Sequence, residues 1–458
     1  MKRFVSIIIS LIMLLGATSL IGCSKPCDEH LFGEWTIIES AKDCTKVGIR
    51  EKECTVCHEK VTEEYYGEHD NRSAWIAESL SHHKVCRKCG ESFSDGAHVY
   101  ENGKCKCGRE EANLNFFNIP DFVVEVETGR EAKVLMLTDT QIIDSSQVRP
   151  DGFLYESLYE PYAPQNMDAL CFSYIRRVVN EAKPDLVILC GDNVFGKYDD
   201  AGTSFLKLIE TMEALDIPWA QAYGNHDNES AKGAKWQNAQ LEAAENCLFK
   251  KGDTDGNGNY SIAIRQGDEI SRMFYVMCSN AVSNAYEPVF NEVVTTYGFT
   301  ANQTKWLYDK MEALEDAYGK TINTSLCFHI PTSEYILGAK QYLKGTNVFS
   351  LDKGSAFVSK FGDFGSWSNT DVEINNPEGY AVPDAYGKTF LQICKKFGVD
   401  TTFCGHHHEN NTSIMYEGIR WTYVLKTGQY DGHIPGELGG TLLQFSNSNY
   451  SIKHIYVA

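Results

Sequence analysis

Hydrophobic and polar residues follow two alternating patterns along the C-terminal part of this chain. Short apolar runs predict strands at residues 122–126, 132–137, 186–189, 219–222, 326–328 and 401–403. Apolar residues spaced three and four apart predict helices at residues 168–182 and 205–215. Residues 260–280 and 418–456 show a β pattern without helices. We therefore predict an α/β fold in which mixed sheets are flanked by helices.

The first 22 residues have a different pattern. Lys2 and Arg3 precede an apolar run that is too short to favour a membrane-spanning helix, and small residues lead to Cys23. The stretch Leu20-Ile21-Gly22-Cys23 resembles the lipobox at the end of a bacterial lipoprotein signal peptide. The resemblance implies lipidation of Cys23. We expect an extracytoplasmic protein that is lipid-anchored to the bacterial cell membrane.

Cysteine content divides the rest of the chain. Eight of the 16 cysteines lie between Cys27 and Cys107. We therefore expect a signal peptide at residues 1–22, a cysteine-rich module at 23–112 and a larger domain at 113–458. Cysteine pairs beside histidines are typical of structural zinc sites, although an exported chain also permits disulfides.

The cysteine-rich module resembles the small zinc-ribbon-like repeats of Gram-positive surface proteins. We expect one zinc ion at Cys27, His30, Cys54 and Cys57, and a second at Cys86, Cys89, Cys105 and Cys107. Cys44 and His98 do not fit this assignment. Closed four-donor sites leave no position for a substrate, so we expect a structural or adhesive module with a cell-surface partner.

Charge narrows the range of partners. The chain carries 42 Lys and Arg against 62 Asp and Glu, which gives a formal net charge of -20. Nucleic-acid binding needs clustered positive charge, so we expect no nucleic-acid partner. A small phosphorylated substrate could still be held by metal ions, whose local charge outweighs the mean field.

Five clusters of metal-type residues follow predicted strands. They are Asp139-Thr140-Gln141, Gly191-Asp192, Gly224-Asn225-His226-Asp227, His329 and Gly405-His406-His407-His408. Open α/β sheets place their sites at the C-terminal ends of strands, so these clusters are expected to meet. Carboxylate, amide and imidazole donors in such numbers suit two neighbouring cations that share a bridging carboxylate.

The order of the five clusters resembles the calcineurin-like metallophosphoesterase superfamily. The resemblance implies a four-layer α/β/β/α sandwich and two divalent or trivalent ions, either Fe, Mn or Zn. It implies that Asp192 bridges the ions and that His226 acts on the phosphoryl group. The remaining implied ligands are Asp139, Gln141 and His408 for the first ion, and Asn225, His329 and His406 for the second. In the family the middle residue of the last motif, here His407, is only a spacer.

Two positions depart from the superfamily pattern. Gln141 stands where a histidine is usual, and Phe195 stands where a second aspartate is usual. The carboxylate that orients His226 is therefore left open among Asp199, Asp200 and Asp227.

Three stretches, residues 224–230, residues 328–331 with Glu334, and residues 138–141, resemble the purple-acid-phosphatase-like branch of the superfamily. The resemblance implies an extracytoplasmic phosphatase that hydrolyses phosphate monoesters by attack of a metal-bridging hydroxide. A phosphodiesterase acting on nucleotides or lipid headgroups is one alternative. Another is a cell-surface binding protein with a vestigial metal centre.

Overall fold

The computed structural model describes most of the chain after residue 29. The described residues are 30–70, 72–77, 80–109, 118–143, 167–196, 199, 201–280, 286–287, 292–293, 298–343, 357–358, 367–368, 389–430, 432–446 and 449–457. Contacts divide the chain into two compact units, Met1–Glu111 and Ala112–Ala458. The predicted signal peptide, Cys23 and Cys27 lie outside the described residues. Among the described helices, none is long and apolar enough to cross a membrane.

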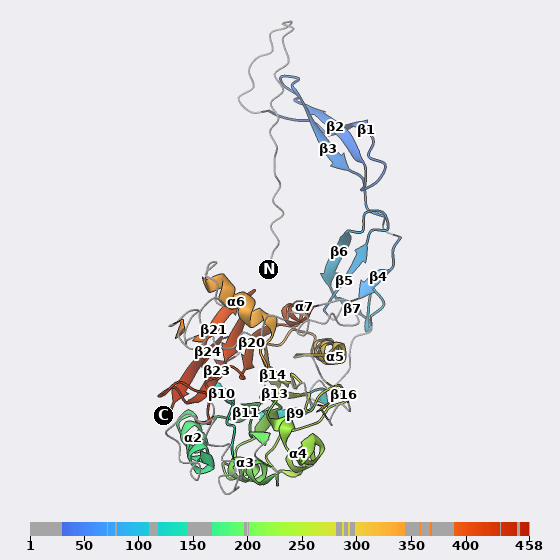
Figure 1. The fold of residues 1–458 in the computed structure, drawn as a ribbon. Helices are drawn as coiled ribbons and strands as arrows, with labels where there is room; N and C mark the ends of the chain where they lie inside the picture. Colours follow the sequence, from blue (N-terminus) through green and yellow to red (C-terminus); the bar gives the residue numbers. More distant parts are fainter. Residues whose placement is uncertain are drawn as a thin grey trace. The chain divides into compact units, whose positions relative to one another are not determined.

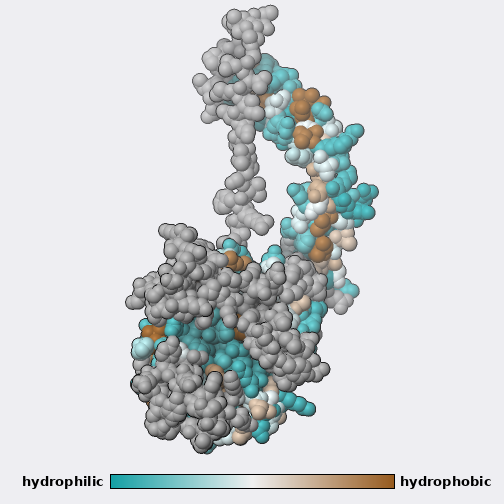
Figure 2. All heavy atoms as spheres, in the orientation of Figure 1, coloured by the Kyte–Doolittle hydropathy of each residue, from teal (hydrophilic) through white to brown (hydrophobic). Residues whose placement is uncertain are grey.

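The N-terminal unit is built from three small antiparallel sheets. The first contains β1 (Thr36–Glu39), β2 (Val47–Glu53) and β3 (Lys60–Tyr66). The second contains β4 (Trp75–Ala77), β5 (Ser81–Val85) and β6 (Ser92–Ala97), and the third pairs β7 (Tyr100–Glu101) with β8 (Lys104–Cys105). Large apolar side chains such as Ile37, Ile38 and Val99 are exposed in this unit, and Figure 2 shows hydrophobic patches on its surface. These sheets therefore enclose very little apolar core.

The larger unit begins with a five-stranded mixed sheet. Its order is β12 (Trp219–Ala222), β11 (Leu186–Cys190), β10 (Ala132–Leu137), β23 (Gly439–Ser446) and β24 (Asn449–Tyr456). β10, β11 and β12 run parallel, whereas β23 and β24 are antiparallel additions. The parallel strands are mostly apolar and buried because both faces of the sheet are covered.

A second, seven-stranded mixed sheet lies against the first. Its order is β21 (Ser413–Tyr416), β22 (Ile419–Tyr423), β20 (Val399–Cys404), β17 (Thr324–Cys327), β14 (Glu269–Val276), β13 (Tyr260–Gln266) and β9 (Phe122–Glu125). β14, β17, β20 and β22 run parallel. The carboxyl ends of β14, β17 and β20 therefore meet at one edge of this sheet.

Helices cover the outer faces of the two sheets. One layer contains α2 (Met167–Ala182), α3 (Thr203–Glu213) and α4 (Gly233–Ala243), and the other contains α5 (Ala301–Tyr318), α6 (Ser333–Leu343) and α7 (Phe390–Lys396). Figure 1 shows these two groups on opposite sides of the sheets. Shorter elements are the 3-10 turn η4 (Asp227–Glu229) and the strands β15 (Tyr286–Glu287), β16 (Glu292–Val293), β18 (Phe357–Val358) and β19 (Trp367–Ser368).

Alternating side chains of the seven-stranded sheet fill two separate cores. On β14, Phe274 and Val276 pack into the core between the sheets, whereas Met273 and Tyr275 pack under α5 and its neighbours. This division follows from the two-residue period of a strand. The predicted four-layer α/β/β/α sandwich of two mixed sheets is confirmed.

Candidate metal centre

The strand ends bring the predicted metal residues together from across the larger unit. Asp139 follows β10 and Asp192 follows β11, while His329, His406 and His408 follow β17 and β20. Two groups result, in which all donor atoms lie within 4.8 Å of one another. One group is Asp139, Asp192 and His408, and the other is Asp192, His329 and His406. Asp192 belongs to both groups, as a bridging carboxylate would.

Each of the two carboxylates has one anchored oxygen and one open oxygen. Asp192 Oδ1 accepts a hydrogen bond from the backbone N–H of His226 at 2.8 Å. Asp139 Oδ2 accepts hydrogen bonds from the backbone N–H of His406 at 3.1 Å and the hydroxyl of Thr138 at 2.8 Å. Within the described residues, no hydrogen-bond donor satisfies Asp139 Oδ1 or Asp192 Oδ2. A buried oxygen without a hydrogen-bond partner costs free energy, so the position of these two oxygens fits a bound cation.

Two implied ligands of the second ion, His329 and Asn225, also have donor atoms without hydrogen-bond partners in the part of the chain that the structure describes. The His329 ring donates a hydrogen bond through Nδ1 to the carbonyl oxygen of Cys190 at 3.0 Å, which leaves Nε2 facing the carboxylates. His329 Nε2 lies 3.1 Å from Asp192 Oδ2. Among the described residues, neither His329 Nε2 nor the buried Asn225 Oδ1 has a hydrogen-bond partner. On the first-ion side, His408 Nε2 lies 3.2 Å from Asp139 Oδ1.

The charges of the site also favour a bound cation. Burial alone would lower the pKa of His329, but the carboxylates of Asp192 and Asp139 raise it to about 9. Burial and the neighbouring rings of His407 and His329 hold the pKa of His406 well below its usual range. Positive charge beside the two carboxylates is therefore favoured, and bound metal ions would supply it.

The backbone of the site is held in uncommon conformations. Asp139, Gln141, Asp192 and His406 all have positive φ, at 49°, 41°, 50° and 72°. Such conformations cost free energy in residues other than glycine, and they concentrate at functional sites. Gly405 is required by close approach, because a Cβ there would lie 1.9 Å from Thr138 Oγ1.

Gln141 differs from the other predicted ligands. Its Oε1 accepts a hydrogen bond of 2.7 Å from the Lys426 ammonium, which also donates to the backbone carbonyl of Asp139 at 3.1 Å. Lys426 is almost fully buried. The predicted ligand oxygen of Gln141 is thus engaged by a cationic side chain, whereas Asp139 Oδ1 is open. The protein donors grouped around the first position are those of Asp139, Asp192 and His408.

Glu229 orients His226, which is a role that the sequence left open. His226 Nδ1 hydrogen-bonds Glu229 Oε2 at 2.8 Å, and Nε2 faces Asp192 Oδ2 at 4.0 Å. The His226 ring stacks on Phe195, with ring centroids 4.1 Å apart, at the position where the family has an aspartate. The three-residue spacing of His226 and Glu229, joined by the η4 turn, is the sequence signal that identifies this pair.

The carboxylates proposed from the sequence for orienting His226 have other contacts. Asp227 accepts hydrogen bonds from the backbone N–H groups of Asn193, Val194 and Gly224, and so ties two site loops together. Asp199 accepts from the first backbone N–H groups of α3, and Asp200 lies outside the described residues. His407 turns away and hydrogen-bonds the Tyr423 hydroxyl at 3.0 Å, in keeping with a spacer.

The cysteine-rich unit groups its donors differently from the sequence assignment. The expected single set of Cys86, Cys89, Cys105 and Cys107 is split, because each cysteine pair lies in its own turn. The observed groups are Cys44, His69, Cys86 and Cys89; His82, His98, Cys105 and Cys107; and His30, Cys54 and Cys57. Cys27, expected in the last group, lies outside the described residues. Cys44 and His98, which the sequence assignment left out, are members.

Curated relatives match only part of their own length. Phosphatase DCR2 of Saccharomyces cerevisiae is 25% identical over 257 residues, which cover 52% of this chain and 38% of the relative. Probable inactive purple acid phosphatase 29 of Arabidopsis thaliana is 23% identical over 282 residues, which cover 58% of this chain and 64% of the relative. The match thus spans less than two thirds of either relative.

Solved structures show a distant likeness. A dimetal phosphatase from Danio rerio is 10% identical with a TM-score of 0.43, and the match covers 71% of this chain and 96% of that one. The purple acid phosphatase PPD1 of yellow lupin (Lupinus luteus) is 11% identical with a TM-score of 0.39, and the match covers 89% of this chain and 57% of that one. The calcineurin-like phosphoesterase family matches residues 132–410, which contain all five strand-end clusters of the larger unit, from Asp139 to His408. The chain belongs to the calcineurin-like phosphoesterase family.

Proposed function

We propose that this chain hydrolyses phosphate monoesters at a dinuclear metal centre. The observation that carries the proposal is the convergence of buried donor atoms that lack hydrogen-bond partners among the described residues. The converging atoms are Asp139 Oδ1, Asp192 Oδ2 and His329 Nε2. Asn225 Oδ1, a ligand that the family resemblance implies, likewise has no hydrogen-bond partner among the described residues. Two ions bound among them would neutralise phosphoryl oxygens and activate water.

The donor set favours Fe, Mn or Zn. Carboxylate and amide oxygens combined with imidazole nitrogens suit these ions. Cys190 and Cys404 lie close behind the site, but burial raises the pKa of both thiols well above its ordinary value. Neutral buried thiols are poor metal ligands, so the centre uses oxygen and nitrogen donors.

His226 is the residue of this chain best placed to act on the substrate. Its Nδ1 is occupied by Glu229, and its ring plane is fixed by Phe195. The Nε2 side faces the bridging-type carboxylate of Asp192 at 4.0 Å. An imidazole held in this way can donate a hydrogen bond to the phosphoryl group and a proton to the leaving oxygen.

Monoester preference rests on the resemblance to purple acid phosphatases and on a relative named as a phosphatase. The test compares p-nitrophenyl phosphate with bis-p-nitrophenyl phosphate after loading the purified chain with Mn, Fe or Zn. We expect faster release from the monoester, and loss of at least about 100-fold (roughly 2.7 kcal/mol) in Asp192→Asn and His226→Ala. His407→Phe, which alters a buried neighbour outside the donor set, is the matched control. Faster release from the diester would favour the phosphodiesterase alternative.

A binding protein with a vestigial centre is the second candidate. Two observations favour it. The Lys426 ammonium hydrogen-bonds Gln141, the residue that stands where the family has a histidine donor. Two relatives are also named as probable inactive purple acid phosphatases. If the metal-loaded chain hydrolyses neither ester while still binding two ions, this second function replaces the first.

We further propose that the chain is exported and held at the bacterial membrane through a lipid on Cys23. The support is the lipobox pattern of residues 20–23. Full-length protein expressed in a bacterium should fractionate with membranes, and Cys23→Ser should shift it to a soluble fraction. A cytoplasmic wild-type protein of unprocessed mass would overturn this part of the proposal.

A further inference from the structure

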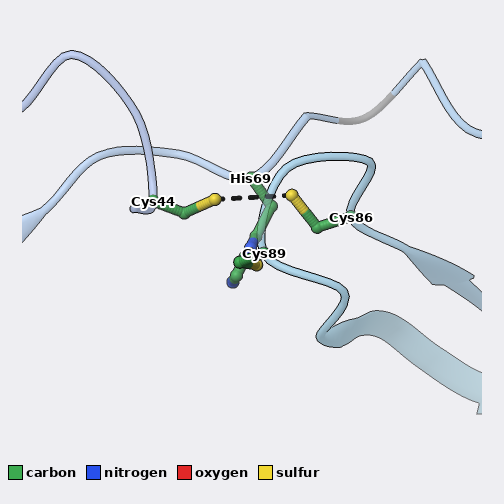
Figure 3. A group of neighbouring side chains, drawn as sticks. All are labelled: Cys44, His69, Cys86 and Cys89. Atoms are coloured by element: carbon green, nitrogen blue, oxygen red, sulfur yellow. Dashed lines mark hydrogen bonds between the residues drawn. The ribbon is translucent and has the colours of Figure 1, made fainter. Parts of the chain in front are cut away.

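The two complete cysteine–histidine groups of the N-terminal unit have the dimensions of tetrahedral metal sites. In the first group, Cys44 Sγ and Cys86 Sγ lie 3.4 Å apart and point toward one another, as Figure 3 shows. Cys89 Sγ lies 3.3 Å from His69 Nδ1 in the same group. All four donor atoms of this group lie within 4.8 Å of one another.

The second group repeats these separations. Cys105 Sγ lies 3.3 Å from His82 Nδ1, Cys107 Sγ lies 3.4 Å from His98 Nδ1, and the two Nδ1 atoms are 3.4 Å apart. A tetrahedral zinc ion, with bonds of about 2.3 Å to sulfur and 2.0 Å to nitrogen, spaces its ligands about 3.3 to 3.8 Å apart. A disulfide would bring two sulfurs to about 2.05 Å. The observed separations match the zinc geometry.

Burial in this unit is confined to the donor groups. Among the described residues 30–109, the buried side chains are those of Cys54, His82, Cys86 and Cys105, and each belongs to one of the groups. Large apolar side chains such as Ile37 are exposed. Sheets this small cannot stabilise themselves by apolar burial, so another source of folding free energy is required.

The cysteine pairs sit in turns shaped to present their sulfurs. The backbone N–H of Gly90 donates to the carbonyl of Cys86 at 2.9 Å, and Gly108 donates to Cys105 at 2.8 Å, with both glycines at positive φ. Cys86 Sγ also accepts from the backbone N–H of Asp70 at 3.3 Å. Such donors favour the thiolate that zinc requires.

Each group draws its donors from consecutive sheets. Cys44 lies between β1 and β2 and His69 follows β3, whereas Cys86 and Cys89 form the turn between β5 and β6. The second group joins His82 on β5 and His98 after β6 to the cysteines around β8. We propose that zinc ions at Cys44–His69–Cys86–Cys89 and at His82–His98–Cys105–Cys107 join the three sheets of the N-terminal unit into one folded body.

Cobalt substitution tests the proposal on the full chain. The catalytic centre lacks thiolate donors, so a thiolate-to-cobalt charge-transfer band reports the N-terminal unit alone. The histidines would bind the metal through Nδ1. A cysteine at the same position would hold the metal about as far from its Cβ as the histidine does, at roughly 3.3 Å. His69→Cys should therefore raise the first site from three thiolates to four, and His82→Cys should raise the second from two to three. Both variants should bind the same number of ions with a stronger band.

Adjacent histidines supply the matched comparison. His82→Ala should lose one zinc ion by native mass spectrometry, whereas His83→Ala, one residue along β5 and outside both groups, should keep every ion. The proposal is overturned if the cysteine variants leave the band unchanged. It is equally overturned if the unreduced wild-type chain holds Cys44 and Cys86 in disulfides without zinc. Neither readout depends on phosphoesterase activity.

Discussion

Replacing Glu229 by glutamine tests how His226 is positioned. The carboxylate accepts a hydrogen bond from His226 Nδ1 at 2.8 Å, and the two side chains are 32% and 20% exposed. A hydrogen bond to a charged group contributes about 1.5 to 3 kcal/mol, and partial exposure reduces this to about 1 to 2 kcal/mol. Glutamine keeps the shape but removes the charge. We expect kcat/KM for p-nitrophenyl phosphate to fall about 5- to 30-fold.

A double-mutant cycle separates positioning from structural damage. If Glu229 acts through His226, the Glu229→Gln change should cost nothing further in a His226→Ala background. The number of bound ions should stay at the wild-type value, because Glu229 is not among the open donors. Glu127→Gln, which alters an exposed carboxylate paired with Arg130, is the control. An equal loss of activity in both backgrounds would refute the positioning role.

Three further changes test the site and the fold. In Gly405→Ala the new Cβ would lie 2.5 Å from Asp139 Oδ2, so we expect loss of one ion by metal analysis, whereas Gly432→Ala, whose new Cβ would make only an ordinary contact of 3.9 Å with Glu409 Oε1, should keep both. Gln141→His adds an imidazole donor, and calorimetric titration with Mn should show the first ion binding about tenfold more tightly, near 1.4 kcal/mol. Burial lowers the pKa of His454 from 6.5 to about 4, so the unfolded chain binds more protons between these values. Stability should therefore fall by about 2 kcal/mol as the pH drops from 6.5 to 4, allowing for partial exposure of the ring, and denaturant unfolding of His454→Gln should show a smaller loss.

Buried strands were the most predictable part of the fold. The bounds predicted for β10 and β12 agree with the structure because each is a mostly apolar run closed by polar or turn-forming residues. Helix α3 begins earlier and ends earlier than predicted. Asp199 caps its first turn, and Leu215 continues the apolar pattern beyond the last helical residue. Apolar spacing marks which positions are buried, whereas helix ends depend on local hydrogen bonds.

The residues that position the site could not be predicted from local sequence patterns. The identities and order of the metal-type clusters indicate the donors, but Lys426 meets Gln141 from 285 positions away in the chain. A C-x-x-C pair likewise identifies two donors and leaves the other two unspecified. His69 and Cys44 join the Cys86 turn only because neighbouring sheets bring them there. Long-range partners of this kind depend on topology, which local patterns do not encode.

The two metal-type regions differ in how folding relates to ion binding. In the catalytic unit, two apolar cores hold the sheets, and the backbone anchors one atom each of Asp139, Asp192 and His329 while the other atom stays open. That scaffold can hold the donors apart before any ion arrives. The N-terminal unit has no comparable core among its described residues. Its donor groups are its interior, so ion binding and folding should be one event there and two separate events in the catalytic unit.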